Sequence, residues 1–284
     1  MESVKDVPVT VIEPSRGWVA VRLDELWEHR ELLYFFVWRD VKVRYKQTAL
    51  GAAWAVLQPL LTMLIFTIFF GQMAGIGSEG VPYPIFSYAG LLPWTFFAHG
   101  LGGASNSLVG SASLLKKVYF PRLIVPVSSV LGGVVDFAVA FVVLIGMMFW
   151  YGVKPGPGVL LLPVLLFLAA AAALGTGLWL SALNVEYRDV RYVMPFFIQL
   201  LLFVTPVIYP ASEVVEKLEA RGIPGWLYGL NPMAGVIQGF RWSLLGSGMS
   251  PWSLLAVGSS VTVLLLAGGL FYFRRMERTF ADVV

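Results

Sequence analysis

The stretch Gln47–Ser78, QTALGAAWAVLQPLLTMLIFTIFFGQMAGIGS, contains no charged side chain. A helix needs roughly 20 consecutive apolar residues to cross a hydrocarbon core about 30 Å thick, and this stretch supplies them. The rest of the chain has the same character, because 58% of its residues are hydrophobic and only 13% are charged, whereas about 25% are charged in ordinary soluble domains. We therefore predict an integral membrane protein rather than a water-soluble globule.

Five more apolar stretches of sufficient length follow the first along the chain. They run over Gly80–Leu115, Leu123–Val153, Gly156–Val185, Tyr192–Ser212 and Trp242–Phe273. One acid, Asp136, interrupts them. Each stretch is long enough for a spanning helix, so the sequence predicts an all-α protein with six transmembrane helices in one membrane domain, residues 47–284.

The basic residues fall mostly on alternate loops. With six spans, 16 of the 20 Lys and Arg residues lie on one side of the membrane, and Lys154, Lys217, Arg221 and Arg241 lie on the other. Basic loop residues stay in the cytoplasm. Both termini are therefore predicted to be cytoplasmic, with residues 1–29 forming an N-terminal arm.

Residues 30–46, RELLYFFVWRDVKVRYK, are too charged to cross a membrane. Helical spacing places an aromatic and apolar stripe on one face and cations on another. The stripe is Tyr34, Trp38, Val41 and Tyr45, and the cations are Arg39, Lys42 and Lys46. This pattern predicts an amphipathic helix in the membrane interface. A plain juxtamembrane anchor is the alternative.

The segment of residues 211–245 precedes the last span and includes GIPGWLYGLNPMAGVIQGF. Its five Gly and two Pro residues argue against a continuous helix that faces lipid. A seventh span would also place Arg274 and Arg275 outside, against the charge distribution. We expect a re-entrant or surface-lying helical hairpin that is buried against protein.

Titratable groups inside the predicted spans are few. Asp136 is suited to pairing across a dimer interface, to a hydrogen bond between helices or to a proton relay, and the hydrogen bond is favoured because a relay needs a chain of such groups. His99 is expected to bond to a neighbouring helix. With His29 as the only other histidine and no cysteine, the sequence predicts no metal site.

Two enzyme motifs are absent, the phosphate-binding loop of ATPases and the nucleophile elbow of serine hydrolases. The chain contains neither GxxxxGK[ST] nor GxSxG, so we expect no enzyme activity and no cofactor in this chain. No nucleic-acid-binding motif accompanies the net charge of +3. If the protein performs work, the energy must come from elsewhere.

Two short turns on the predicted cytoplasmic side combine charged and aromatic residues. They read KKVYFPR from Lys116 and NVEYRDVRY from Asn184. Such turns suit docking to a soluble partner, but stopping transfer into the membrane is the favoured interpretation from these residues alone.

Six motifs together resemble a known family. They are WRDVKVRYKQTALGAAWAVLQPL from Trp38, PWTFF from Pro93, KKVYFPR from Lys116, NVEYRDV from Asn184, TPVIY from Thr205 and NPM from Asn231. In this order and spacing they resemble the membrane subunits of bacterial type-2 ABC exporters of polysaccharide, the O-antigen, capsule and teichoic acid permeases. The resemblance covers almost the whole chain.

The resemblance implies a homodimeric channel in the bacterial inner membrane, with two separate ATPase subunits that bind ATP and Mg²⁺. Its substrate would be an undecaprenyl-linked polysaccharide. The two turns would then be coupling elements rather than stop-transfer signals. Their candidate residues are Lys116, Lys117, Tyr119, Phe120, Arg122, Glu186, Tyr187, Arg188 and Asp189.

The interface helix would lie where the lipid-linked diphosphate enters the channel. Arg39, Lys42, Arg44 and Lys46 are the candidates for contact with its phosphates, although contact with membrane lipid or with the ATPase is an open alternative. Aromatic side chains would provide platforms for sugar rings, and membrane anchoring is the alternative role. The candidates are Tyr34, Trp38, Tyr83, Tyr88, Trp94, Phe196, Phe197 and Tyr209.

Two other functions stay open from the sequence. One is export of a drug or a small lipid by the same kind of transporter. The other is a membrane-embedded enzyme that acts on a lipid-linked sugar, against which the small number of intramembrane acids and bases argues.

Overall fold

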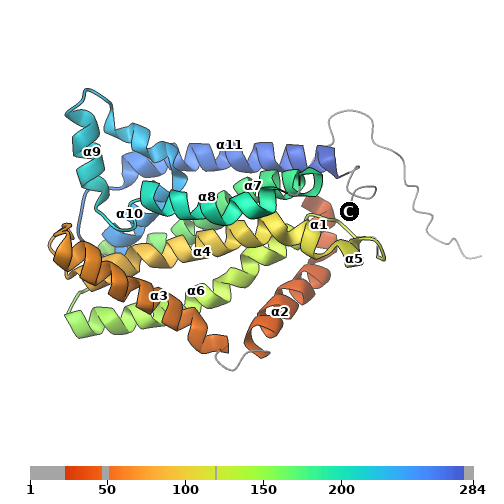
Figure 1. The fold of residues 1–284 in the computed structure, drawn as a ribbon, viewed down its shortest axis with the longest axis horizontal. Helices are drawn as coiled ribbons and strands as arrows, with labels where there is room; N and C mark the ends of the chain where they lie inside the picture. Colours follow the sequence, from red (N-terminus) through yellow and green to blue (C-terminus); the bar gives the residue numbers. More distant parts are fainter. Residues whose placement is uncertain (1–22, 47–50, 119, 188, 278–284) are drawn as a thin grey trace, which may run out of the picture.

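The computed structural model describes residues 23–46, 51–118, 120–187 and 189–277, and within these ranges every regular element is helical (Figure 1). The predicted Tyr119 and Arg188 lie outside the described residues. The elements are α1 (Leu23–Glu28), α2 (Arg30–Lys46), α3 (Gly51–Phe66) with the π-helical η1 (Thr67–Met73), α4 (Tyr83–Gly110), α5 (Ala112–Leu115), α6 (Ile124–Tyr151), η2 (Pro157–Leu161), α7 (Leu162–Glu186), α8 (Val190–Val204), α9 (Ala211–Glu219), η3 (Gly225–Leu230), α10 (Pro232–Leu245) and α11 (Trp252–Met276).

Four of the described helices are long and apolar enough to cross a membrane. They cover Ala53–Met73, Ile124–Tyr151, Gly158–Glu186 and Trp252–Met276. The other two predicted spans correspond to α4, which has 28 residues and carries polar side chains in its second half, and to α8, which has 15 residues. At 1.5 Å per residue α8 is about 22 Å long, shorter than a hydrocarbon core.

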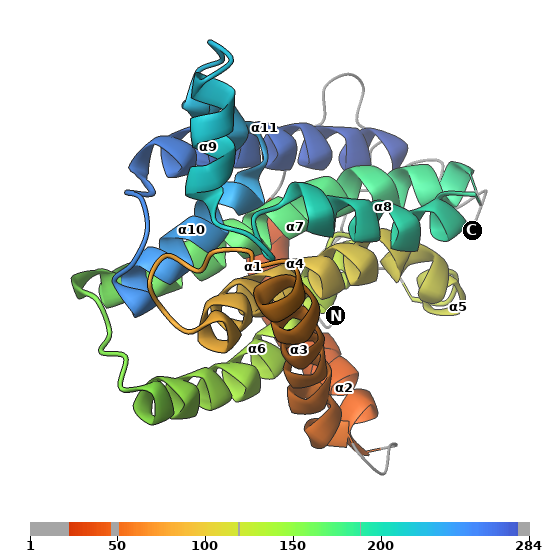
Figure 2. The same cartoon turned by 60° about the vertical axis from the view of Figure 1, so that its left-hand side comes forward.

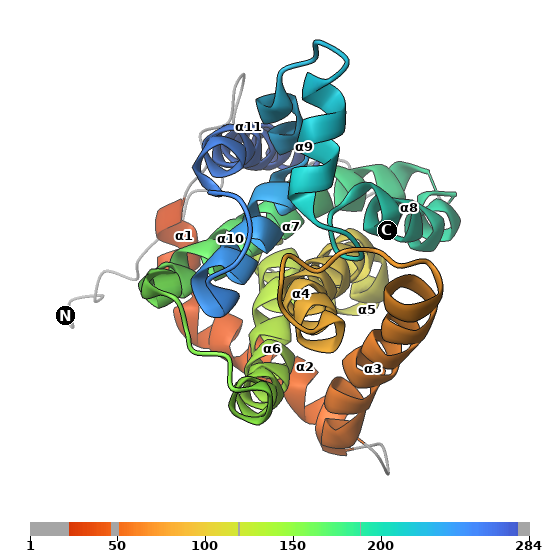
Figure 3. The ribbon, with the colours of Figure 1, turned by 90° about the vertical axis from the view of Figure 1, so that its left-hand side faces the viewer.

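Helix α4 occupies the centre of the bundle. Figure 3 shows it surrounded by α3, α6, α7, α8 and α10. Most of its residues are buried, including Phe86, Tyr88, Leu92 and Leu101. Because neighbouring helices cover α4 on all sides, it forms the core of the bundle and buries polar side chains such as Ser105 together with its apolar ones.

Small residues let α7 approach its two main neighbours. A methyl group on Gly177 would lie 2.6 Å from Ala104 Cβ on α4, and one on Gly175 would lie 2.7 Å from the backbone nitrogen of Leu266 on α11. Van der Waals packing through small residues is the main source of helix association in lipid. The Ala- and Gly-rich middle of α7 therefore holds α4 and α11 together.

The segment before the last helix packs against protein. Nearly all of α10 is buried, with Ile237, Phe240 and Arg241 fully enclosed. It contacts α11, α4 and α7. The shorter α9 lies across the end of the bundle and projects from it (Figure 2).

The two ends of the described chain meet at one end of the bundle, the end that carries α5 and is called here the α5 end (Figure 1). Arg274 Nη2 on α11 lies 2.9 Å from Glu25 Oε2 on α1. The Arg122 guanidinium donates a hydrogen bond to the backbone carbonyl of Glu277. These contacts tie the first and last helices to the turn after α5.

Candidate functional site

A cavity of about 1140 Å³ lies between α3, α4, α6 and α8. Its wall combines aromatic rings with uncharged polar groups and one acid–base pair. The main side chains are Trp54, Gln58, Thr62, Trp94, Thr95, Phe96, His99, Asn106, Phe137, Arg44 and Asp136. The cavity is partly open rather than enclosed, and Trp54 in its wall is 53% exposed. Stacking surfaces beside hydrogen-bonding groups can hold an elongated polar ligand with apolar faces, such as a sugar chain.

The C-terminal end of α2 is attached to α6 at this cavity. Arg44 Nη1 forms an ion pair with Asp136 Oδ2, and the Tyr45 hydroxyl donates a hydrogen bond to Asp136 Oδ1. Burial is the main cause that raises the pKa of Tyr45, and the neighbouring Arg44 opposes it. The phenol therefore stays protonated and remains a donor to the carboxylate.

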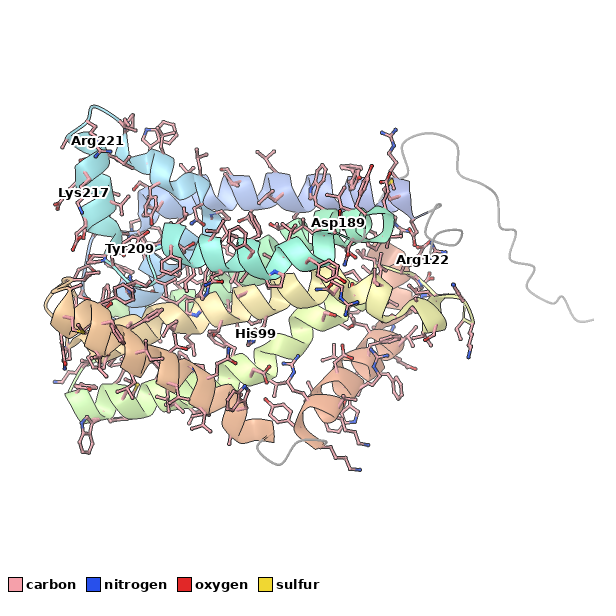
Figure 4. All side chains as sticks on the ribbon, viewed as in Figure 1. His99, Arg122, Asp189, Tyr209, Lys217 and Arg221 are labelled. Carbon is pink, nitrogen blue, oxygen red and sulfur yellow. The ribbon has the colours of Figure 1, made fainter. Side chains whose placement is uncertain are left out.

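A smaller cavity of about 430 Å³ shares Arg44, His99 and Gly103 with the large one. Arg39 and Asp40 line it, and their side chains form an ion pair of 2.8 Å. Figure 4 places His99 near the middle of the bundle. The two cavities therefore meet at the attachment of α2 to α6.

The four predicted phosphate contacts divide into two pairs. Arg39 and Arg44 line the cavities and each pairs with an acid. Lys42 and Lys46 are exposed, and neither lines either of the two cavities described above.

The predicted channel aromatics are dispersed in the structure. Of the eight candidates, all of which are described residues, only Trp94 lines the large cavity. Tyr34, Trp38, Phe196 and Phe197 are exposed on the surface. Tyr83, Tyr88 and Tyr209 donate hydrogen bonds to the backbone carbonyls of Ile208, Ala140 and Phe203, at 2.7, 3.2 and 2.8 Å. Tyr83 and Tyr88 thereby join α4 to the segment after α8 and to α6, and Tyr209 bonds back to the end of α8.

Sequence reasoning missed Trp54, Phe96 and Phe137 in the cavity wall. A usable signal was present on α3, where Trp54, Gln58 and Thr62 follow one another at intervals of four residues. Such spacing puts all three side chains on one face of a helix. An aromatic and polar face inside an apolar span indicates a wall of a cavity rather than a surface in contact with lipid.

The two candidate coupling turns lie at the α5 end of the bundle. Figure 4 shows Arg122 and Asp189 there, whereas Lys217 and Arg221 lie at the opposite end. Lys116, Lys117, Glu186, Tyr187 and Asp189 are exposed. A hydrogen bond with Glu186 is the main cause that raises the pKa of Tyr187.

Phe120 differs from the other residues of its turn. It is 6% exposed, and its ring centre lies 5.5 Å from that of Phe36 on α2. The prediction grouped Phe120 with residues that present themselves to a partner, but its side chain instead anchors α2 on the turn. Its apolar ring gains more from burial than from exposure.

The TPVIY and NPM motifs form a structural joint rather than part of the cavity. The Asn231 amide donates to the Thr205 hydroxyl at 2.9 Å, and its carbonyl oxygen accepts from the Met233 backbone at 3.1 Å. Tyr228 donates to the Val204 carbonyl at 2.9 Å. The end of α8 and the start of α10 are thereby joined.

Comparison with known proteins agrees with this architecture. The model of the ABC-2 type transporter family matches residues 31–245. An O-antigen export system permease protein RfbA of Myxococcus xanthus is 30% identical over 256 residues, which cover 89% of this chain and 96% of that protein.

More distant relatives have related names. An O-antigen export system permease protein RfbA of Klebsiella pneumoniae is 27% identical over 89% of this chain and 95% of its own length. A polysialic acid transport protein KpsM of Escherichia coli is 22% identical over 84% of this chain and 91% of its own length. The family match spans α2 to α10 and includes the cavity and both turns, so the chain belongs to the ABC-2 type transporter family.

Proposed function

We propose that this chain is the permease subunit of an ATP-driven exporter that moves a lipid-linked polysaccharide across the bacterial inner membrane. The observation that carries the proposal is the similarity to O-antigen export permeases over 89% of the chain. The large cavity supports it, because aromatic rings and uncharged polar groups alternate on its wall. A cavity for a small apolar drug would not need so many hydrogen-bonding groups.

Six spans with both termini in the cytoplasm are part of the proposal. The ion pair between Glu25 and Arg274 supports it, because it brings the first and last described helices to the same end of the bundle. That end also carries both basic turns. In this topology α8 and the residues that follow it complete a span that α8 alone is too short to form.

Separate ATPase subunits would dock at the α5 end and would bind the ATP and Mg²⁺. The turn around Lys116 and the turn around Glu186 support this docking, because both expose charged side chains at that end. Closure of the ATPase subunits would then move both turns together.

A second copy of the chain would complete the channel. The cavity is bordered by α3 and α8, and both helices expose apolar side chains such as Trp54 and Phe203. Sugar rings would pack on the aromatic side chains, and the hydroxyls would bond to groups such as Gln58 and Thr95. The diphosphate of the lipid carrier would contact the basic end of α2.

Co-purification tests the proposal most directly. The chain is expressed with a candidate ATPase, ideally one encoded beside its gene. Complex formation and ATP hydrolysis are measured for the natural chain, for Lys117→Glu and for the matched control Lys154→Glu. Lys154 is also exposed but belongs to the opposite side in the proposed topology. We expect Lys117→Glu to weaken assembly or coupled hydrolysis and Lys154→Glu to have no effect.

Failure of any ATPase to co-purify would contradict the transporter assignment. Loss of surface polysaccharide on deletion of the gene, restored by the natural chain, tests the substrate separately. Export of a small lipid with normal surface polysaccharide would support the alternative substrate.

A further inference from the structure

A single carboxylate holds the basic end of α2 against α6. Asp136, near the middle of α6, accepts from Arg44 through one oxygen and from Tyr45 through the other. The Asp136 side chain is 17% exposed, whereas that of Arg44 is 43% exposed. An anion arriving from outside can therefore reach the guanidinium more easily than it can reach the carboxylate.

This attachment lies where the two cavities meet. Arg44 and His99 line both. Among the described residues that line the large cavity, Arg44 is the only Lys or Arg, and Asp136 is the only Asp or Glu. An anionic group that enters the large cavity thus finds one strong cationic partner, and that partner already bonds to a carboxylate.

We propose that the phosphates of a lipid-linked diphosphate displace Asp136 from Arg44, and that this exchange releases the C-terminal end of α2 from α6. The inference rests on the proposed function, which supplies the diphosphate. Arg44 changes from a structural partner of Asp136 into a contact of the substrate, and Asp136 becomes the residue that positions Arg44 before the substrate arrives.

The direction of the exchange follows from charge and geometry. A guanidinium forms two parallel hydrogen bonds with phosphate oxygens, and a diphosphate carries more negative charge than one carboxylate. Once the diphosphate binds Arg44, it lies close to the partly buried Asp136, and two like charges at such short range repel each other. Separation of α2 from α6 relieves this repulsion. A neutral lipid with the same tail cannot cause it.

The sequence offers a clean way to measure this movement, because the chain contains no cysteine. A Cβ atom at Gly132 of α6 would lie 3.9 Å from Asp40 Cβ of α2, which is within the range of about 3.5–4.5 Å for a disulfide. The double variant Asp40→Cys with Gly132→Cys therefore reports whether α2 is in place. Gly100→Cys with Ala173→Cys serves as the control between α4 and α7, because those Cβ atoms would lie 3.3 Å apart and neither residue lines the two cavities described above.

The experiment uses the permease with its ATPase in vesicles, without ATP and with a mild oxidant. The vesicles contain undecaprenyl diphosphate, undecaprenol or neither, and inorganic diphosphate is tested alone. We expect undecaprenyl diphosphate to slow formation of the α2–α6 disulfide about tenfold, the change that corresponds to about 1.4 kcal/mol, and undecaprenol to leave it unchanged. The α4–α7 disulfide should respond to neither lipid. An equal effect of inorganic diphosphate would show that the anion alone is sufficient, and an effect of the lipid alone would show that the tail is needed to deliver it.

Two variants test the assignment of residues. Asp136→Asn should slow the α2–α6 disulfide without any ligand and remove most of the response, while the α4–α7 disulfide forms normally and shows that the bundle is folded. Arg44→Gln should also abolish the response. If labelled undecaprenyl diphosphate binds and the α2–α6 disulfide forms at an unchanged rate, the exchange is wrong and the proposed function stands. If the labelled lipid does not bind at all, both the exchange and the proposed phosphate contact are wrong.

Discussion

The guanidinium carbon of Arg241 lies 3.6 Å from the centre of the Phe86 ring, in the interior of the bundle. The same guanidinium donates hydrogen bonds to the carbonyls of Pro206 and Val207, at 2.7 and 2.6 Å. Arg241 is fully buried. It therefore joins α10, α4 and the segment after α8 at one point.

Removal of this cation should destabilise the protein. Arg241→Met keeps much of the side-chain volume but leaves several buried carbonyls without donors, each at a cost of about 1–3 kcal/mol. We expect a clear fall in the unfolding temperature of the purified protein in detergent. Arg221→Met, at an exposed position, is the control and should leave that temperature unchanged. Equal stability of the two variants would show that the carbonyls find other donors.

Gly90 makes room for the same guanidinium. A Cβ atom at Gly90 would lie 2.6 Å from Arg241 Nη2 and 3.2 Å from the Val207 carbonyl oxygen. Gly90→Ala should therefore lower stability by displacing Arg241. Gly146→Ala is the matched control in α6, because its Cβ would meet nothing within 4 Å. The control should be neutral or should stabilise by up to about 1 kcal/mol, since alanine has the higher helix propensity. Thermal unfolding of both purified variants measures the difference. An unfolding temperature of Gly90→Ala above that of Gly146→Ala would contradict the prediction.

Phe120 should affect stability rather than direct recognition of the ATPase. Phe120→Ala removes a buried ring and should cost about 3–5 kcal/mol, and it should loosen α2, which packs on that ring through Phe36. Any loss of ATPase binding in Phe120→Ala should follow from this loss of stability. Phe120→Leu should therefore restore most of the stability, and ATPase binding with it. Lys117→Glu should instead weaken ATPase binding at normal stability. Normal stability of Phe120→Ala with loss of ATPase binding would identify Phe120 as a direct contact.

Trp54 should matter for transport without affecting the fold. It lines the large cavity and is 53% exposed, so Trp54→Ala should change stability by no more than about 0.5 kcal/mol. Tryptophan is enriched among the contacts whose loss costs more than about 1 kcal/mol of binding, and we expect a several-fold slower appearance of polysaccharide at the cell surface. Trp54→Phe should retain much of the activity. Trp226→Ala, at an exposed position elsewhere, is the control. Unchanged export by Trp54→Ala would mean that the polymer does not use this wall.

Much of the helical framework was predictable from charge and apolar length. The helix predicted over residues 30–46 has those bounds in the structure, and each of the six apolar stretches contains a helix. The central position of α4 was not predicted. It depends on which helix is covered by neighbours on all sides, and a run of apolar residues looks similar whether lipid or protein covers it.

The candidate site was less predictable than the framework. The sequence pointed to Arg44, His99 and Asp136 as residues of interest, but it did not pair Arg44 with Asp136. Most of the predicted channel aromatics lie elsewhere in this protomer, because aromatic residues also serve as anchors and as hydrogen-bond donors between helices.

The sequence by itself established that the chain is a helical membrane protein, where its helices run and which family it resembles. These properties are local, because a helix in lipid must satisfy its own backbone hydrogen bonds within one continuous segment. The partners of the isolated polar groups required the folded structure. Arg44 and Asp136 are 92 positions apart in the chain, and Arg241 and Phe86 are 155 apart. No local pattern specifies such pairs, which arise only when the packing of small residues has set the position of each helix against its neighbours.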